Sequence, residues 1–203
     1  MKTFTQISIS LALTLGLGSV ALAGDAKTPA PAPAPAKKEA APAAKMEPMK
    51  APQELTDLGK MMAGTWKCTG KAAMDPKDMT KMVDMKMTMK MKLDLGGWWM
   101  VGNMDSPMFK GAKYVTYDPT AKKWYSMMMD SMGGSETTTS MGMKDNKFVW
   151  EGDMRSPMPG MAAAKVRETH DMSDMKAGAK MTGEMSMDGG KTWMKGWESV
   201  CKK

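Results

Sequence analysis

Methionine is the residue whose type and spacing could do chemistry in this chain. There are 30 methionines among 203 residues, and four of them alternate with Lys or Thr in one short segment: Met85, Met87, Met89 and Met91. Thioether sulfur is a soft ligand that suits soft monovalent ions such as Cu(I) and Ag(I). Alternate residues of a strand lie on one face about 6–7 Å apart, so these side chains could converge on one ion. The spacing therefore predicts a Cu(I)/Ag(I) site at these four residues.

Two other uses of methionine fit the same composition. From Gln53 onward the chain has four leucines, two phenylalanines and no isoleucine, so methionine is the apolar residue left to fill a core. Other methionines lie where turns are expected, and we expect these to be exposed, where a thioether can reduce oxidants: Met132, Met158, Met172 and Met175. Core filling, soft-metal binding and oxidant scavenging are the three alternatives.

The remaining candidates for catalysis form no recognised constellation. His170 is the single histidine, and we expect it on the surface or at a strand end, with haem ligation as the alternative. Several carboxylates could supply an acid/base pair, but no spacing singles out two of them: Glu136, Glu151, Asp153, Glu168 and Asp171. We therefore predict no catalytic residue and expect a protein that is not an enzyme.

The methionine segment itself has the periodicity of a β-strand. From Met85 to Leu95 every second residue is apolar, which predicts one buried and one solvated face. Beyond Gly64, short alternating segments are separated by Gly, Pro, Asp and Asn turn signals at regular intervals, as in all-β barrels and sandwiches. We predict an all-β fold, an antiparallel up-and-down β-barrel of about ten strands, with a short N-terminal helix at 53–63. The expected strands are 64–73, 80–95, 97–105, 111–118, 122–130, 134–143, 146–154, 163–171, 178–187 and 191–201.

The two cysteines fit a closed barrel. Cys68 lies in the first expected strand and Cys201 in the last, and these strands are neighbours when an up-and-down barrel closes. We expect a structural disulfide between them, which would restrict the unfolded chain over a loop of more than 100 residues. Two free buried thiols are the first alternative, and a metal or redox pair is the second, although the sequence has no close CxxC spacing.

The N-terminal part of the sequence has a different character. Residues 1–23 have a basic start, an apolar run too short to span a bilayer and a small-x-small motif ending at Ala23, which predict a cleaved secretory signal peptide. Residues 24–52 are rich in Ala, Pro and Lys and predict a disordered linker. Residues 53–203 are the expected barrel domain. The predicted location is periplasmic or secreted, and we expect no membrane insertion.

Ser186 to Trp193, SMDGGKTW, matches the Asp-box hairpin signature, in which an aspartate binds turn amides. We interpret this single copy as a structural turn. Gly64-Thr65-Trp66 resembles the G-x-W start of lipocalin-like (calycin) barrels. The segments 114–134 and 186–198 are similar to a bacterial secreted family known as domain of unknown function 1579, although Thr116 stands where that family usually has glycine. The resemblance covers roughly residues 55–203 and implies a barrel fold, and it carries over no catalytic residue.

The formal net charge of +7 is spread over lysines interspersed with acids, and no nucleic-acid motif is present, so we expect no nucleic-acid partner. The leading hypothesis is a non-enzymatic envelope protein that binds a small apolar ligand inside the barrel or has a structural role. The alternative is a methionine-rich periplasmic protein that binds Cu(I) or Ag(I). The sequence gives no indication of the oligomeric state.

Overall fold

The computed structural model describes residues 49–75, 78–157 and 163–203. The predicted signal peptide (1–23), most of the predicted linker (24–52) and Met158 lie outside these residues. The elements, in chain order, are α1 (Gln53–Met62), β1 (Gly64–Ala73), β2 (Met82–Asp94), a 3₁₀ turn (Leu95–Gly97), β3 (Trp99–Asp105), β4 (Lys110–Asp118), β5 (Lys123–Asp130), β6 (Ser135–Ser140), β7 (Met143–Lys144), β8 (Lys147–Arg155), β9 (Ala163–Asp171), β10 (Ala179–Ser186) and β11 (Met194–Lys202).

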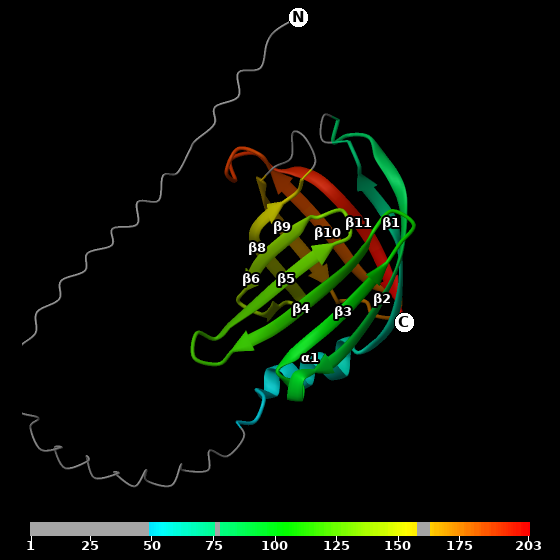
Figure 1. The fold of residues 1–203 in the computed structure, drawn as a ribbon. Helices are drawn as coiled ribbons and strands as arrows, with labels where there is room; N and C mark the ends of the chain where they lie inside the picture. Colours follow the sequence, from blue (N-terminus) through cyan, green and yellow to red (C-terminus); the bar gives the residue numbers. More distant parts are fainter. Residues whose placement is uncertain (1–48, 76–77, 158–162) are drawn as a thin grey trace, which may run out of the picture. The chain divides into compact units, whose positions relative to one another are not determined.

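The strands form a closed antiparallel barrel. Each long strand pairs with its neighbours in the sequence, β6 pairs with β8, and β1 pairs with β11, so the order returns on itself (Figure 1). The two-residue β7 only extends the hairpin that leads into β8. Ten strands therefore make up the barrel, which confirms the predicted up-and-down topology.

One predicted strand ends earlier than its sequence suggests. The pattern predicted a strand at 134–143, but β6 stops at Ser140 and the chain resumes as β7 at Met143. Gly142 has φ 102°, a conformation that favours glycine and breaks the ladder. Asp145 and Asn146 then have φ of 50° and 59°, the left-handed pair typical of a tight hairpin turn. The local turn chemistry therefore overrides the continuous β pattern.

Helix α1 covers one end of the barrel (Figure 1). Its apolar residues recur at helical spacing, which buries Leu55 and Met62 against the strands. The indole nitrogen of Trp66, in β1, donates a hydrogen bond of 2.7 Å to the carbonyl oxygen of Met62. The helix end is thus fixed to the first strand, and its observed bounds agree with the predicted 53–63.

The predicted Cys68–Cys201 disulfide is present and joins the first and last strands. The two residues face each other in the β1–β11 register, with a Cα–Cα distance of 4.0 Å and a sequence separation of 133. Both side chains are buried. The bond therefore closes the barrel covalently at the seam where the chain ends meet.

Methionine fills much of the barrel core. Buried methionines come from β2, β3 and β10, together with α1. Of the methionines expected at exposed turns, Met132 and Met175 are indeed exposed. The prediction for Met172 was wrong, because its backbone N–H donates to the carbonyl of Asn146 and its side chain packs into the core.

Candidate functional site

The barrel interior encloses a cavity of about 270 Å³. The wall on the β2 side consists of the four methionines singled out by the sequence, which all line this cavity: Met85, Met87, Met89 and Met91. Three of them are buried, and Met89 faces Met104 of β3 in the strand register. The alternation of β2 thus places the predicted thioether array in one wall of one cavity.

The cavity extends between the two ends of the barrel. Leu58 and Met62 of α1 line it at one end, and Met74 after β1 and Met132 in the β5–β6 turn line it at the other. Phe109 also lines this second end, at the start of β4.

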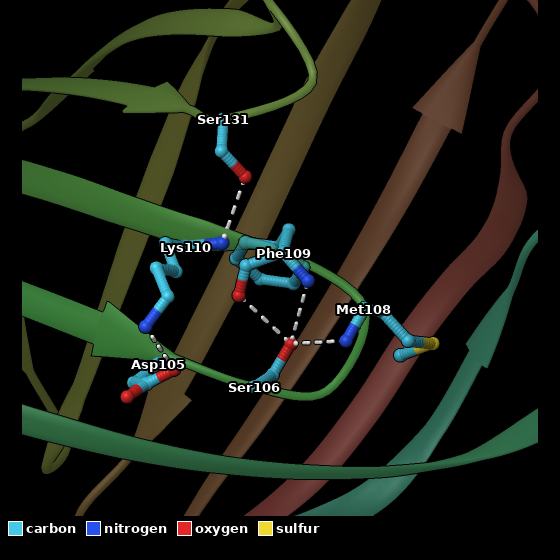
Figure 2. Close-up of polar contacts among 6 residues, drawn as sticks. All are labelled: Asp105, Ser106, Met108, Phe109, Lys110 and Ser131. Atoms are coloured by element: carbon cyan, nitrogen blue, oxygen red, sulfur yellow. Dashed lines mark hydrogen bonds and ion pairs between the residues drawn. The ribbon is translucent and has the colours of Figure 1, made fainter.

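A hydrogen-bonded turn holds Phe109 in place (Figure 2). The Ser106 hydroxyl accepts from the backbone N–H groups of Met108 and Phe109, at 3.1 and 3.0 Å, and donates to the Phe109 carbonyl. The backbone N–H of Lys110 donates to the Ser131 hydroxyl in the adjacent turn, which links the two turns. Hydrogen bonds within and between these two turns therefore fix the end of the cavity that lies opposite α1.

A buried ion pair crosses the interior from β4 to β9. The Lys113 Nζ lies 2.7 Å from Glu168 Oε2, and the two side chains are 10% and 7% exposed. Burial acts to lower the pKa of Lys113, but the nearby Glu168 and Glu136 carboxyls outweigh it and raise this pKa. Burial likewise acts to raise the pKa of Glu168, but Lys113 and His170 hold it well below its ordinary value. The pair is therefore fully charged at neutral pH.

His170 belongs to the same cluster. Its Nε2 lies 3.4 Å from Glu168 Oε2, and its side chain is 16% exposed. It lies near the end of β9, as expected, but it lines the cavity and not the surface. The reason is strand alternation, because His170 shares the inward face of β9 with Glu168 and Val166.

Glu136 is a second buried carboxyl in the cavity wall. It lies on β6 opposite Met128 of β5, and Met128 in turn lies opposite Lys113 of β4. Burial, followed by repulsion from Glu168, raises the pKa of Glu136 to about 8, although Lys113 opposes the shift. At neutral pH this carboxyl therefore retains its proton in the cavity as it stands.

Several buried polar atoms around this cluster have no hydrogen-bond partner among the described residues: Ser126 Oγ, Glu136 Oε1, Thr138 Oγ1 and Trp150 Nε1. Ser126 and Thr138 face each other in the β5–β6 register, and Trp150 lies opposite Glu168 in the β8–β9 register. Of these four residues, Glu136 and Trp150 line the cavity. Buried polar groups are normally satisfied, so these two leave one acceptor and one donor that a bound molecule could satisfy.

Aromatic rings support the polar cluster from β8. Trp150 is stacked on Phe148 at a centroid distance of 5.6 Å and lies 6.4 Å from the His170 ring. The Lys113 Nζ lies 6.0 Å from the Trp150 ring centroid. The site thus combines an apolar, polarisable wall with one ion pair, one protonated carboxyl and an unpartnered indole N–H.

The polar half of the site escaped the sequence analysis. Glu136 and Glu168 were among the carboxylates considered, but nothing in the sequence pairs them, and Lys113 was not singled out. Strand alternation could have indicated two of these positions, because Lys113 shares its face with Val115 and Glu168 shares its face with Val166. On β6, SETTTS, every residue is polar, so alternation gives no signal for Glu136.

The Asp-box segment is a structural hairpin, as predicted. Asp188 accepts hydrogen bonds from the backbone N–H groups of Lys191 and Thr192 and from the hydroxyls of Ser186 and Thr192. These donors, those of Thr192 first, hold the pKa of Asp188 well below its ordinary value. The Trp193 indole donates to the Gly190 carbonyl. The segment therefore organises the β10–β11 turn.

The described part of the chain contains no cluster of three or more His, Cys, Asp or Glu residues suited to a metal ion. Methionine is not one of these four residue types, so the finding does not concern a thioether site. Within the same residues, no helix has the length and apolar character needed to cross a membrane.

The fold and the cavity define a class: a closed antiparallel ten-stranded barrel, consistent with the calycin-like type, whose apolar interior contains a small buried polar cluster. The chain belongs to the family described as "Protein of unknown function (DUF1579)", which matches residues 51–203. This confirms the resemblance found in the sequence. No curated protein matches the chain.

Proposed function

We propose that this protein is a non-enzymatic binding protein that encloses a small, mostly apolar ligand inside the barrel. The observation that supports this is the interior cavity of about 270 Å³, lined mainly by apolar side chains and bordered by a few polar groups. Such a combination is typical of small-molecule sites. Flexible methionine side chains let the wall adapt to the ligand.

The polar cluster favours binding over catalysis. Glu168 is held by Lys113 and His170, so its carboxylate is engaged and its pKa is low. Of the two buried carboxyls, Glu136 is the one with an oxygen that has no hydrogen-bond partner among the described residues. One carboxyl of this kind can fix the polar end of a ligand, whereas general acid/base chemistry requires both partners to reach the substrate.

We also propose that the protein is exported to the periplasm or the medium. Residues 1–23 have the pattern of a signal peptide, and the Cys68–Cys201 disulfide is compatible with an oxidising compartment. The intact mass of the protein from a periplasmic fraction tests this. We expect a chain that begins at Gly24, and a cytosolic chain that retains Met1 would contradict it.

Native mass spectrometry of the protein purified from its own host under argon tests ligand binding. We expect an added organic mass that is lost on denaturation. A variant with a blocked cavity should lack the added mass. Val115 is buried and lines the cavity, so in V115F a phenyl ring would occupy part of the cavity. The matched control is V149F, where the same change is made at an outward position that is 42% exposed. Equal ligand retention in both variants would contradict an interior site.

Binding of Cu(I) or Ag(I) is the second candidate function. The observation that favours it is that four methionines of β2 line one cavity, with Met104 of β3 opposite Met89. Five thioethers from two adjacent strands are a suitable donor set for a soft monovalent ion.

Silver titration under argon, followed by mass spectrometry, separates the two candidates. In the variant M85L/M87L/M89L/M91L, leucine preserves apolar volume but removes sulfur, so we expect loss of Ag(I) binding. The control replaces exposed methionines in the same number: M127L/M129L/M141L/M143L, at positions 41–76% exposed. If the β2 variant binds Ag(I) with the same affinity as the native protein, these four methionines are not the silver site.

A further inference from the structure

With all of its acids ionised, the wall of the cavity would have one positive charge fewer than its carboxylates require. The cations that line it are Lys113 and Arg155, and the acids that line it are Asp130, Glu136 and Glu168. Asp130 accepts backbone hydrogen bonds in the β5–β6 turn. Lys113 is paired with Glu168. In the described part of the chain, Glu136 on β6 is therefore the acid of the wall that has neither an ion pair nor a backbone hydrogen bond.

Glu136 is also the acid of the wall with an unused hydrogen-bonding atom. The residue is only 2% exposed and lines the cavity. Its Oε1 has no hydrogen-bond partner in the described part of the chain. A buried polar atom without a partner is costly, and the cost is relieved when a ligand supplies the partner. The absent ion-pair partner and the unused atom thus coincide on one residue.

We infer that the cavity takes an amphiphilic ligand with an apolar body and one positively charged end, of the alkylammonium class, and that the Glu136 carboxylate binds this end. The inference rests on the proposed ligand-binding function and names the class of ligand. An ammonium group supplies both the charge and the N–H donors that Glu136 lacks.

The rest of the wall suits a cation better than an anion. Trp150, whose aromatic ring is electron-rich, lines the cavity together with the polarisable thioether sulfurs of β2. A ligand carboxylate would enter beside Glu168 and Glu136, with Lys113 already engaged by Glu168. An uncharged ligand would leave the Glu136 carboxyl protonated and gain no ion pair.

Binding of an ammonium group should release a proton from the protein. Because burial and then Glu168 raise the pKa of Glu136 to about 8, this carboxyl carries a proton at pH 7 while the cavity lacks the cation. Lys113 on β4 and Glu168 and His170 on β9 are the other titratable groups of the cluster. When the ammonium pairs with Glu136, the carboxyl O–H bond breaks, the proton passes to the buffer, and the carboxylate keeps the electron pair.

The cavity volume sets the size of the probe. At roughly 30 Å³ for each non-hydrogen atom, about 270 Å³ accommodates about nine such atoms. Octylamine, octanol and octanoate have eight-carbon chains of this size and differ in the charge of one end. They form a matched series for a positive, a neutral and a negative ligand.

Isothermal titration calorimetry of the full-length protein at pH 7 tests the inference, with each probe measured in phosphate and in Tris. We expect octylamine to bind about 10- to 100-fold more tightly than octanol, and octanoate to bind most weakly. The difference in apparent binding enthalpy between the two buffers should correspond to release of up to one proton with octylamine and of none with octanol. In E136Q the preference for the amine should disappear. E151Q is the control, since Glu151 is exposed and lies opposite Thr139 on the outer face beside β6.

Each of the other outcomes would contradict a specific part of the inference or of the proposed function. If octanol binds as tightly as octylamine and no proton is released, the charged end is wrong and the ligand-binding function stands. If E136Q folds and retains the amine preference, Glu136 does not bind the ammonium. If E136Q fails to fold, proton release by the native protein decides. If none of the three probes binds, the proposed function fails and this inference fails with it.

Discussion

Replacement of Lys113 by methionine probes the buried ion pair on which the polar cluster depends. The Nζ of Lys113 lies 2.7 Å from Glu168 Oε2, and both side chains are almost fully buried. Methionine keeps much of the side-chain length but removes the charge, so the Glu168 carboxylate would retain only His170, at 3.4 Å. Removal of one partner from a buried pair typically costs about 3–5 kcal/mol. We expect about 3 kcal/mol, since His170 still offsets part of the penalty.

Urea unfolding followed by tryptophan fluorescence measures this loss at pH 7. With a slope of about 2 kcal/mol per molar urea, the midpoint should fall by about 1–2 M. The matched control is K110M on the same strand. Lys110 pairs with Asp105 at 3.2 Å, but the two side chains are 74% and 67% exposed. Solvent screens that pair, so its loss should leave the midpoint unchanged within error.

The double variant K113M/E168Q tests the cause of the loss. If the penalty arises from an unpaired buried charge, removal of the carboxylate as well should recover most of the lost stability. The deficit of K113M should also shrink near pH 4, because without Lys113 the folded-state pKa of Glu168 rises and its protonated form is favoured. A K113M variant as stable as the native protein, or a double variant less stable than the single one, would refute the reasoning.

Three further predictions concern stability. Because the folded-state pKa of Glu136 is raised to about 8, folding retains a proton that the unfolded chain has lost, so native stability should fall as pH rises from about 5 to 8, by up to about 1.4 kcal/mol per pH unit. Urea titrations at both pH values measure this slope, and E136Q should flatten it; parallel slopes would contradict the prediction. Reduction of Cys68–Cys201, which closes a loop with a sequence separation of 133, should lower the unfolding free energy by about 5 kcal/mol in urea, and a loss below about 1 kcal/mol would argue against the chain-entropy account. In D188A, the amide of Thr192 should exchange faster with solvent, as seen by hydrogen-exchange mass spectrometry, because it loses its acceptor; unchanged exchange would show that the β10–β11 turn does not depend on Asp188.

Most of the barrel could be predicted from local patterns. The alternation from Met85 to Leu95 sets both the strand and its inward face, and the observed β2, Met82–Asp94, differs from the predicted 80–95 by two residues or fewer at each end. The end of β6, predicted at 143 but observed at Ser140, and the start of the last strand, predicted at 191 but observed at Met194, have equally large boundary errors. Before the last strand, the hydrogen bonds of Asp188 extend the turn through Thr192.

The polar cluster could not be predicted in the same way, because it depends on closure of the barrel. Lys113 and Glu168 are 55 residues apart in the sequence and lie on strands that do not pair. Alternation can assign each residue to the inward face, but it cannot say which residues meet across the interior. Glu136 also lies on a strand with no apolar residue to mark its inward face. A binding site across a barrel is therefore a property of the closed sheet.

The two faces of β5 show why one explanation does not cover all the methionines. Met128 points inward, packs against the core and lines the cavity, whereas Met127 and Met129 are 44% and 41% exposed on the outside of the same strand. Core filling accounts for the first but not for the other two, since exposed positions favour polar residues. The inner methionines have a shared environment, the cavity, so ligand or metal binding can act on them together. The outer ones share only access to solvent, which makes oxidant scavenging a hypothesis for the surface alone. The inner and the outer methionines therefore raise separate functional questions, and each set requires its own experiment.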